Sequence, residues 1–396
     1  MIVLGAGGVG KTTIAAALGV ACAQAGTETA LITIDPARRL RDALGLHTLD
    51  GVPTRLNPDR LKRAGMDREL RLSAMVLDVK RQWDGLVEQF IPDPATRDRI
   101  LANGFYRTLA GRFAGSDAYA ALEQLYEIRA SGRFDAAIVD TPPAAHAFEF
   151  IQAPGRLVQL LESGAARYLL ASPAVPGAGL AFKIASRAAR FVMRELEIFA
   201  GGKVLSSIAD FFTSAAAATA ALTDRFRKAE AMLRSPTVHF VIVTTAEPDR
   251  LAQVRELIEE LHREKLAPVA IIVNRYLDEE AWREPAASRR STPHLPLRST
   301  PGGSANHNRE LRAAVAYLNE YRERLRNDRA RVKTFAEALA ADMEVMAVPE
   351  IPGEVGDLNT LKRIGAYLVR GGIASDRGPE RAHRRASGKT PRRKRK

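Results

Sequence analysis

The chain of 396 residues carries a formal net charge of +13, and residues 377–396 hold ten Lys and Arg against one acid. With 46% hydrophobic and 27% charged residues, its composition is typical of a folded protein with more than one compact core and excludes a disordered or fibrous chain. The single cysteine, Cys22, excludes an intrachain disulfide framework, and we expect a cytoplasmic protein because the sequence has neither a signal-peptide pattern nor a long uncharged apolar run.

Short, nearly continuous apolar runs recur along the chain and predict buried strands. Segments with helical patterning separate them, chiefly residues 11–24, 251–265 and 311–343. Apolar strands that alternate with helices are typical of a parallel sheet covered on both faces. We therefore predict an α/β protein with a mostly parallel, doubly wound sheet, whose strands lie at residues 1–4, 30–34, 136–139, 239–244, 269–273 and 343–348.

Two stretches between these strands are too long for simple crossovers. Residues 58–132 and 150–235 are interpreted as mostly helical, and we predict that they form a helical subdomain inserted into one domain of residues 1–375. Residues 283–308 are rich in Pro, Gly and Ser and predict a flexible loop. The basic residues 376–396 predict a disordered tail, which is either a solvated end or a weak contact for polyanions.

The segment from Gly5 to Thr13 carries the clearest chemical signal. It fits the phosphate-binding loop G-x-x-x-x-G-K-[ST], and it follows a predicted strand and opens a predicted helix, as that loop requires. Backbone N–H groups of such a loop wrap the phosphates, its lysine reaches the β- and γ-phosphates, and its hydroxyl binds Mg²⁺. We predict ATP and Mg²⁺ as cofactors, with Thr12 on the metal and a nucleotide-binding set of Gly7, Gly8, Val9, Gly10, Lys11, Thr12 and Thr13.

Two aspartates follow predicted strands and offer the carboxylates that phosphoryl transfer with Mg²⁺ needs. Asp140 closes the run 136–139, where it either holds the Mg²⁺ shell through water or caps a helix. Asp35 follows the second strand, where it either orients the attacking water or simply caps the strand end. The residue patterns leave both alternatives open.

Four segments, in this order along the chain, resemble the arsenical-pump ATPase family, which also includes the ATPases that deliver tail-anchored membrane proteins. They are the phosphate loop, Asp35-Pro36-Ala37-Arg38-Arg39-Leu40, Asp140-Thr141-Pro142-Pro143-Ala144-Ala145-His146 and Val273-Asn274-Arg275. The resemblance spans about residues 1–370 and is nearest to single-unit bacterial members. It implies a P-loop NTPase fold, ATP hydrolysis, a homodimer, and a helical subdomain that binds a client protein or membrane partner.

The resemblance also implies roles for single residues. Lys11 and Asp35 would be catalytic, and Asn274 and Pro349 would lie beside the adenine base. Two switch segments would respond to the nucleotide, and their residues are Asp35, Pro36, Asp140, Thr141 and His146. For His146, a relay of movement toward the helical subdomain and a simple packing role both stay open.

The sequence departs from the family at two points. Members generally carry a lysine directly after the first glycine that reaches across a dimer, whereas this chain has Ala6. The cysteines that bind metalloids or zinc in relatives are missing as well, so we expect neither an arsenite nor a zinc site. Two alternatives remain: a partition- or cell-division-type ATPase held on DNA or membrane by its basic tail, and a nucleotide-dependent binding module that does not hydrolyse ATP.

Overall fold

The computed structural model describes residues 1–34, 38–44, 46, 51–66, 70–112, 116–142, 144–162, 207–208, 210–277, 305–339, 343–351 and 357–370. The predicted tail and residues 283–304 of the predicted loop lie outside this part of the chain, so both stay predictions. Residues 305–308, predicted to belong to the loop, instead begin the helix Ala305–Glu337. Within the described residues no helix is both long and apolar enough to cross a membrane.

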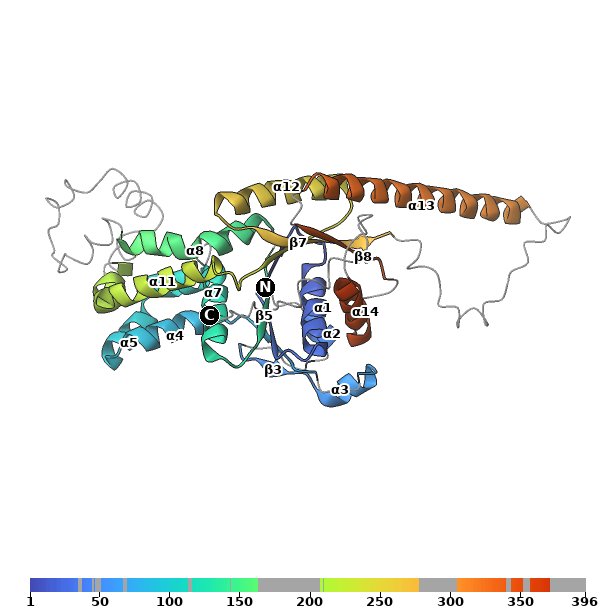
Figure 1. The fold of residues 1–396 in the computed structure, drawn as a ribbon. Helices are drawn as coiled ribbons and strands as arrows, with labels where there is room; N and C mark the ends of the chain where they lie inside the picture. The colour runs from blue at the N-terminus through green and yellow to red at the C-terminus, as the bar shows by residue number, and fades with distance from the viewer. Residues whose placement is uncertain are drawn as a thin grey trace, which may run out of the picture.

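A single sheet organises the described part of the molecule (Figure 1), with the strand order β3-β4-β2-β5-β1-β6-β7-β8. Neighbouring strands run parallel, except that β3 pairs antiparallel with β4. The strands are β1 (Ile2–Gly5), β2 (Thr29–Thr33), β3 (Thr54–Arg55), β4 (Leu72–Val76), β5 (Ala136–Asp140), β6 (Phe240–Thr244), β7 (Pro268–Tyr276) and β8 (Glu344–Pro349). The predicted α/β class with a mostly parallel, doubly wound sheet is confirmed.

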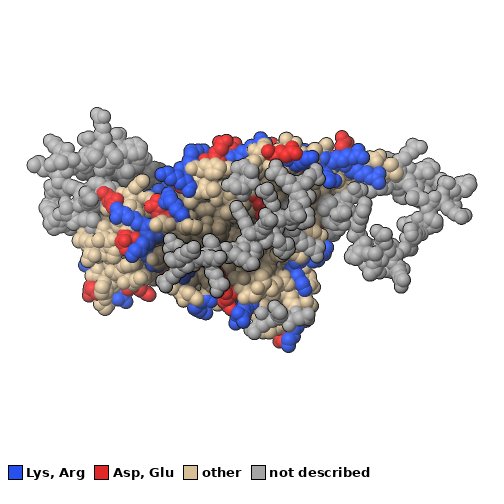
Figure 2. All heavy atoms as spheres, viewed as in Figure 1, with Lys and Arg blue, Asp and Glu red and all other residues tan. Residues whose placement is uncertain are grey.

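Helices cover both faces of this sheet. They are α1 (Lys11–Gln24), α2 (Arg38–Leu44), α3 (Pro58–Arg63), α4 (Val79–Phe90), α5 (Pro94–Ala102), α6 (Gly104–Arg112), α7 (Ser116–Ser131), α8 (Ala144–Glu162), α11 (Thr219–Leu233), α12 (Pro248–Arg263), α13 (Ala305–Glu337) and α14 (Leu358–Arg370). Figure 1 shows α1, α2 and α14 on one side and the group α4, α5, α7, α8 and α11 on the other. In Figure 2, basic and acidic side chains are interleaved along the edge that α12 and α13 form.

The alternation of side chains along β1 explains why the sheet has two cores. Ile2 and Leu4 point into the core shared with α4, α7, α8, α11 and α12, whereas Val3 points into the core shared with α1 and α14. Every residue of β1 is buried, because β5 and β6 flank it and helices cover both of its faces. The loop that follows β1 is therefore anchored at the centre of the molecule.

Helix α14 lies directly on α1. A Cβ atom added to Gly365 of α14 would come within 3.0 Å of the carbonyl oxygen of Ala17 in α1. The two helices therefore approach each other closely at this point, with Leu361 and Ile364 buried in the same core as Val20.

Residues 58–132, interpreted as a mostly helical insertion, also contain one strand of the sheet. Helices α3 to α7 lie in this range, but Leu72–Val76 forms β4, which pairs in register with β2. The run Leu-Ser-Ala-Met-Val has a polar residue and one β-branched residue, so it lacks the strand signal of the other runs. Tertiary pairing with β2 decides its conformation.

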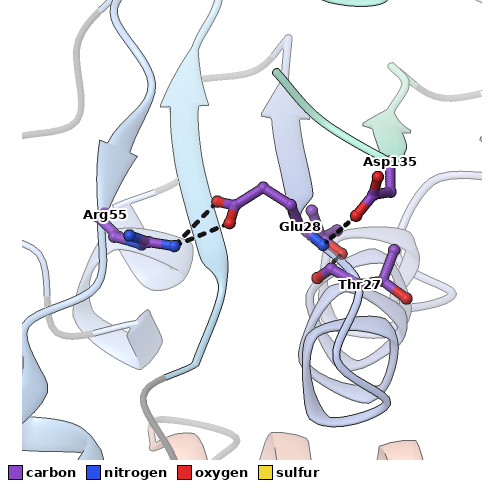
Figure 3. A network of polar contacts seen from close by, with 5 residues as sticks. Thr27, Glu28, Arg55 and Asp135 are labelled. Atoms are coloured by element: carbon purple, nitrogen blue, oxygen red, sulfur yellow. Dashed lines mark hydrogen bonds and ion pairs between the residues drawn. The ribbon is translucent and has the colours of Figure 1, made fainter. Parts of the chain in front are cut away.

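Polar contacts join the amino ends of β2 and β5 to the carboxyl end of the antiparallel β3, at the end of the sheet opposite the phosphate loop (Figure 3). Arg55 of β3 donates to both carboxylate oxygens of Glu28, at 3.1 and 2.9 Å, and the N–H of Glu28 donates to Asp135 at 2.9 Å. These residues immediately precede β2 and β5 or belong to β3. The network thus links β2, β3 and β5 at the end of the sheet that lies away from the phosphate loop.

Helices α4, α7, α8 and α11 pack on one another beside the sheet, and we call this group the helical subdomain; the predicted bounds of the insertions stay predictions. Trp83 of α4 lies against Tyr119 of α7 with ring centroids 5.2 Å apart, and Tyr119 meets Phe226 of α11 at 4.6 Å. Behind these rings Arg225 Nε donates to the fully buried carboxylate of Glu123 at 2.8 Å. A buried ion pair and an aromatic cluster thus join α4, α7 and α11.

Candidate functional site

The phosphate loop occupies the turn between β1 and α1. Gly5 lies so close to β6 that an added Cβ would be 2.2 Å from the carbonyl oxygen of Val243, and Gly10 has a left-handed φ of 93°. Both positions require glycine, the first for close approach and the second for its backbone conformation. The loop also lies where the order of the strands reverses around β1, which is where parallel sheets bind ligands.

Lys11 begins α1 and turns back over the loop. Its Nζ donates to the carbonyl oxygen of Ala6 at 2.9 Å, and the residue is only 8% exposed. The ammonium group therefore lies over the concave side of a loop whose backbone leads into a helix N-terminus. This arrangement favours an anion such as phosphate.

Three side chains from separate elements meet at the carboxyl ends of the central strands. The carboxylate of Asp140, which is 2% exposed, accepts hydrogen bonds from Thr12 Oγ1 at 2.6 Å and from Thr33 Oγ1 at 3.1 Å. A hydroxyl beside a carboxylate, at the first turn of the phosphate-loop helix, is the donor set that Mg²⁺ prefers in nucleotide sites. The chemistry of these donors fits Mg²⁺ beside a bound triphosphate.

Thr33 was not among the predicted site residues. It is the last residue of β2, two positions before Asp35, and it is fully buried. Its hydroxyl helps hold Asp140 on the side that faces Thr12. A polar residue at the carboxyl end of a predicted strand was the signal available in the sequence.

The segment predicted to be the second switch is held to the central strand β1 by a hydrogen bond. Thr141 Oγ1 donates to the carbonyl oxygen of Val3 at 2.7 Å, directly after β5. Helix α8 begins at Ala144, so the segment leads straight into the helical subdomain. The backbone of His146 lies in α8, but its side chain is outside the described part, as are Asp35 and Pro36; their predicted roles stay predictions.

Asn274, which the resemblance alone assigns to the adenine base, lies against the phosphate loop in the structure. Its Nδ2 donates to the carbonyl oxygen of Val9 at 2.8 Å, and the residue is 6% exposed. Pro349 ends β8 beside Tyr276 of β7, at the same edge of the sheet. Thr13 lies in the first turn of α1.

The helical subdomain encloses a second feature, an apolar cavity. Its volume is about 60 Å³, and its lining includes Trp83, Leu86, Phe105, Leu161, Phe212 and Phe226. Tyr106 also lines it, but the hydroxyl of Tyr106 donates to Asp84 at 2.8 Å, and burial raises the pKa of that phenol. The cavity holds about two waters' volume and offers them no polar partner, so it is suited to apolar groups.

The fold, with its phosphate loop and the polar side chains at the carboxyl ends of the central strands, defines a P-loop nucleotide-binding protein. The sequence model of a family described as "Anion-transporting ATPase" matches residues 1–293, and the chain belongs to that family.

Curated relatives match a shorter part of the chain. An "ATPase get3" of Schizosaccharomyces pombe is 32% identical over 157 residues, which cover 40% of this chain and 44% of the relative. An "ATPase GET3" of Kluyveromyces lactis is 31% identical over 170 residues, covering 40% and 46%, and one of Lachancea thermotolerans is 33% identical over 170 residues, covering 40% and 45%. The matched part thus spans less than half the length of these relatives.

Proposed function

We propose that this protein binds ATP with Mg²⁺ at the phosphate loop and hydrolyses it. The observation that carries the proposal is the hydrogen bond between Thr12 and Asp140, which brings the two predicted metal-binding groups together beside Lys11. Membership of an ATPase family supports the same conclusion.

Each residue of the site contributes a distinct step. Lys11 exchanges its contact with the Ala6 carbonyl for the β- and γ-phosphates, and the loop N–H groups bind the remaining phosphate oxygens. Thr12 would hold Mg²⁺ directly and Asp140 would hold it through water, and the bound ion would supply positive charge beside the phosphates. Asp35 orients the attacking water, and Asn274 and Pro349 lie beside the nucleotide.

We further propose that the nucleotide state changes the binding of an apolar client by the helical subdomain. Asp140 is joined to α8 by only a few residues, and α8 contributes Leu157 and Leu161 to the apolar cavity. The cavity of about 60 Å³ is too small for a peptide segment, so a client would bind only after the surrounding helices separate. Movement of Asp140 with the nucleotide supplies a cause for that separation.

Release of phosphate by the purified protein tests the hydrolysis. We expect steady-state release that depends on Mg²⁺ and that Lys11→Ala abolishes, while Lys62→Ala, a change of an exposed lysine in α3, leaves it intact. Unchanged turnover in Lys11→Ala would contradict the assignment of the site. ATP binding without any release would favour the alternative that Ala6 suggests, a binding module without hydrolysis.

Capture experiments test the client. We expect an apolar segment to bind to the Asp35→Asn protein in ATP and to be released in ADP. Binding that did not differ between ATP and ADP would contradict the coupling. Capture of DNA or anionic vesicles in place of an apolar segment would favour the partition-type alternative.

A further inference from the structure

Strand β7 is distorted where it meets the phosphate loop. Its parallel pairing with β8 shifts register between Val273 and Tyr276, and Arg275 between them has a left-handed φ of 54°. This conformation is costly for an arginine and persists only where the surroundings fix it. Asn274 lies in this distorted segment, directly before Arg275.

Asn274 contacts the loop at two adjacent residues. Its Nδ2 lies 2.8 Å from the carbonyl oxygen of Val9, and a Cβ added to Gly10 would be 2.3 Å from the same nitrogen. A carbonyl oxygen only accepts hydrogen bonds, so the amide nitrogen and not its oxygen must face Val9. The side chain thus packs on the two loop residues that immediately precede Lys11.

This contact fixes the orientation of one peptide group. In a trans peptide the C=O and the following N–H point in opposite directions. Because Asn274 holds the carbonyl of Val9, the N–H of Gly10 must point away from Asn274. A loop that binds phosphate through its N–H groups depends on such orientations being set before the ligand arrives.

We propose that Asn274 is a positioning residue for the phosphate loop, which holds the Val9–Gly10 peptide in the orientation that binds phosphate. The inference rests on the proposed binding of a triphosphate at this loop. It differs from the predicted contact with adenine, because a loop anchor acts on any ligand that carries the phosphates, with or without a base.

A ligand without a base separates the two roles. Calorimetry would measure the affinity of wild type and of Asn274→Ala for ATP, GTP and tripolyphosphate, each with Mg²⁺. We expect the variant to bind all three more weakly by one common factor of about five to ten, as for the loss of one hydrogen bond to a buried group. The ratio of ATP to GTP affinity stays unchanged. Asn274→Asp should weaken all three further, because its carboxylate faces both the Val9 carbonyl and the bound anion.

Two controls distinguish positioning from general loss of stability. Thr29→Val removes a different buried hydrogen-bond donor, the hydroxyl at the amino end of β2 that donates to the carbonyl of Thr27 at 3.0 Å; it should leave tripolyphosphate affinity unchanged. In protein labelled with ¹⁵N-glycine, Asn274→Ala should shift the Gly10 amide resonance, whereas Thr29→Val should not.

The outcomes decide whether Asn274 positions the phosphate loop or binds the base. Equal tripolyphosphate affinity in wild type and Asn274→Ala, with a loss of preference for ATP over GTP, would overturn the inference and assign Asn274 to the base. A wild-type protein that bound neither ATP nor tripolyphosphate would overturn the proposed function, and the inference with it.

Discussion

The hydroxyl of Thr12 lies 2.6 Å from the carboxylate of Asp140, although 128 residues separate them in the chain. Thr12 lies in the first turn of α1, and Asp140 is the last residue of β5. Pairing of β1 with β5 brings the two together, and the contact is the most specific feature of the candidate site.

Removal of either partner should uncouple nucleotide binding from Mg²⁺. We expect Mg²⁺ to tighten ATP binding to the wild type at least about tenfold and to have little effect on Thr12→Val or Asp140→Asn, because the metal loses a ligand or its water shell. Titration of ATP with and without Mg²⁺ measures this. Asp135→Asn, at the other end of β5, is the matched control and should behave as wild type. If Mg²⁺ tightened ATP binding as much in both site variants as in the wild type, the assignment of a metal site to Thr12 and Asp140 would be wrong.

Asp35 is predicted to act on the water and not on affinity. We expect Asp35→Asn to keep ATP affinity within about twofold and to lower kcat by about 10² to 10⁴, the range typical of a lost general base or water-positioning group. Equilibrium binding and phosphate release on the same protein check the two quantities. The exposed Asp59→Asn in α3 serves as control. A collapse of affinity would instead make Asp35 a structural or metal-linked residue.

Ala6 offers a test of whether two chains cooperate in hydrolysis. A cation supplied by a second chain to a phosphoryl transition state contributes about 10³ to 10⁵ in rate when its geometry is right. We expect slow basal turnover in the wild type and faster turnover in Ala6→Lys, with a gain that increases with protein concentration. Ala6→Met, which has similar length and no charge, should give no gain. Fast wild-type turnover that is independent of concentration would indicate a complete site in one chain.

The ion pair in the helical subdomain should contribute strongly to stability. Glu123 is fully buried between Arg225 and the hydroxyl of Tyr119, which donates to it at 2.9 Å. Glu123→Gln leaves the Arg225 charge without its carboxylate and should lower the free energy of unfolding by about 3–5 kcal/mol. Urea denaturation measures this.

An exposed ion pair on the same helix provides the control. Asp224 and Lys228 on α11 form an ion pair at 2.7 Å with both side chains more than half exposed. Asp224→Asn should cost less than about 1 kcal/mol, because water screens the pair. If Glu123→Gln and Asp224→Asn lowered the free energy of unfolding by similar amounts, burial of the Glu123–Arg225 pair would not be what determines its contribution to stability.

The strands around the phosphate loop were predictable because their central residues form apolar runs. The bounds of α1, Lys11–Gln24, match the prediction, since the phosphate-loop motif sets its start and Gly26 follows its end. Strand β4 was missed because its identity depends on pairing with β2, which local composition does not encode. Short-range patterns thus predicted the buried centre better than the edge of the sheet.

In the candidate site, local backbone conformation was predictable from the sequence, whereas contacts between distant residues were not. The phosphate-loop motif predicts the conformation around Lys11, since Gly8 and Gly10 have positive φ values that glycine adopts without strain. The hydrogen bond from Thr33 to Asp140 and that from Asn274 to Val9 join residues more than 100 positions apart. The sequence indicates that such polar groups share one edge of the sheet, but only the packed structure selects their partners.

The packing of α14 on α1 has a consequence for synthesis of the protein on the ribosome. Within the described chain, the helix that carries Lys11 and Thr12 leaves the ribosome well before Gly365 and its neighbours, which cover it. Strand β6, which supports Gly5, also emerges more than 200 residues after β1. The nascent chain therefore cannot complete its phosphate loop early, and nucleotide should assist folding only after nearly the whole described chain has been translated.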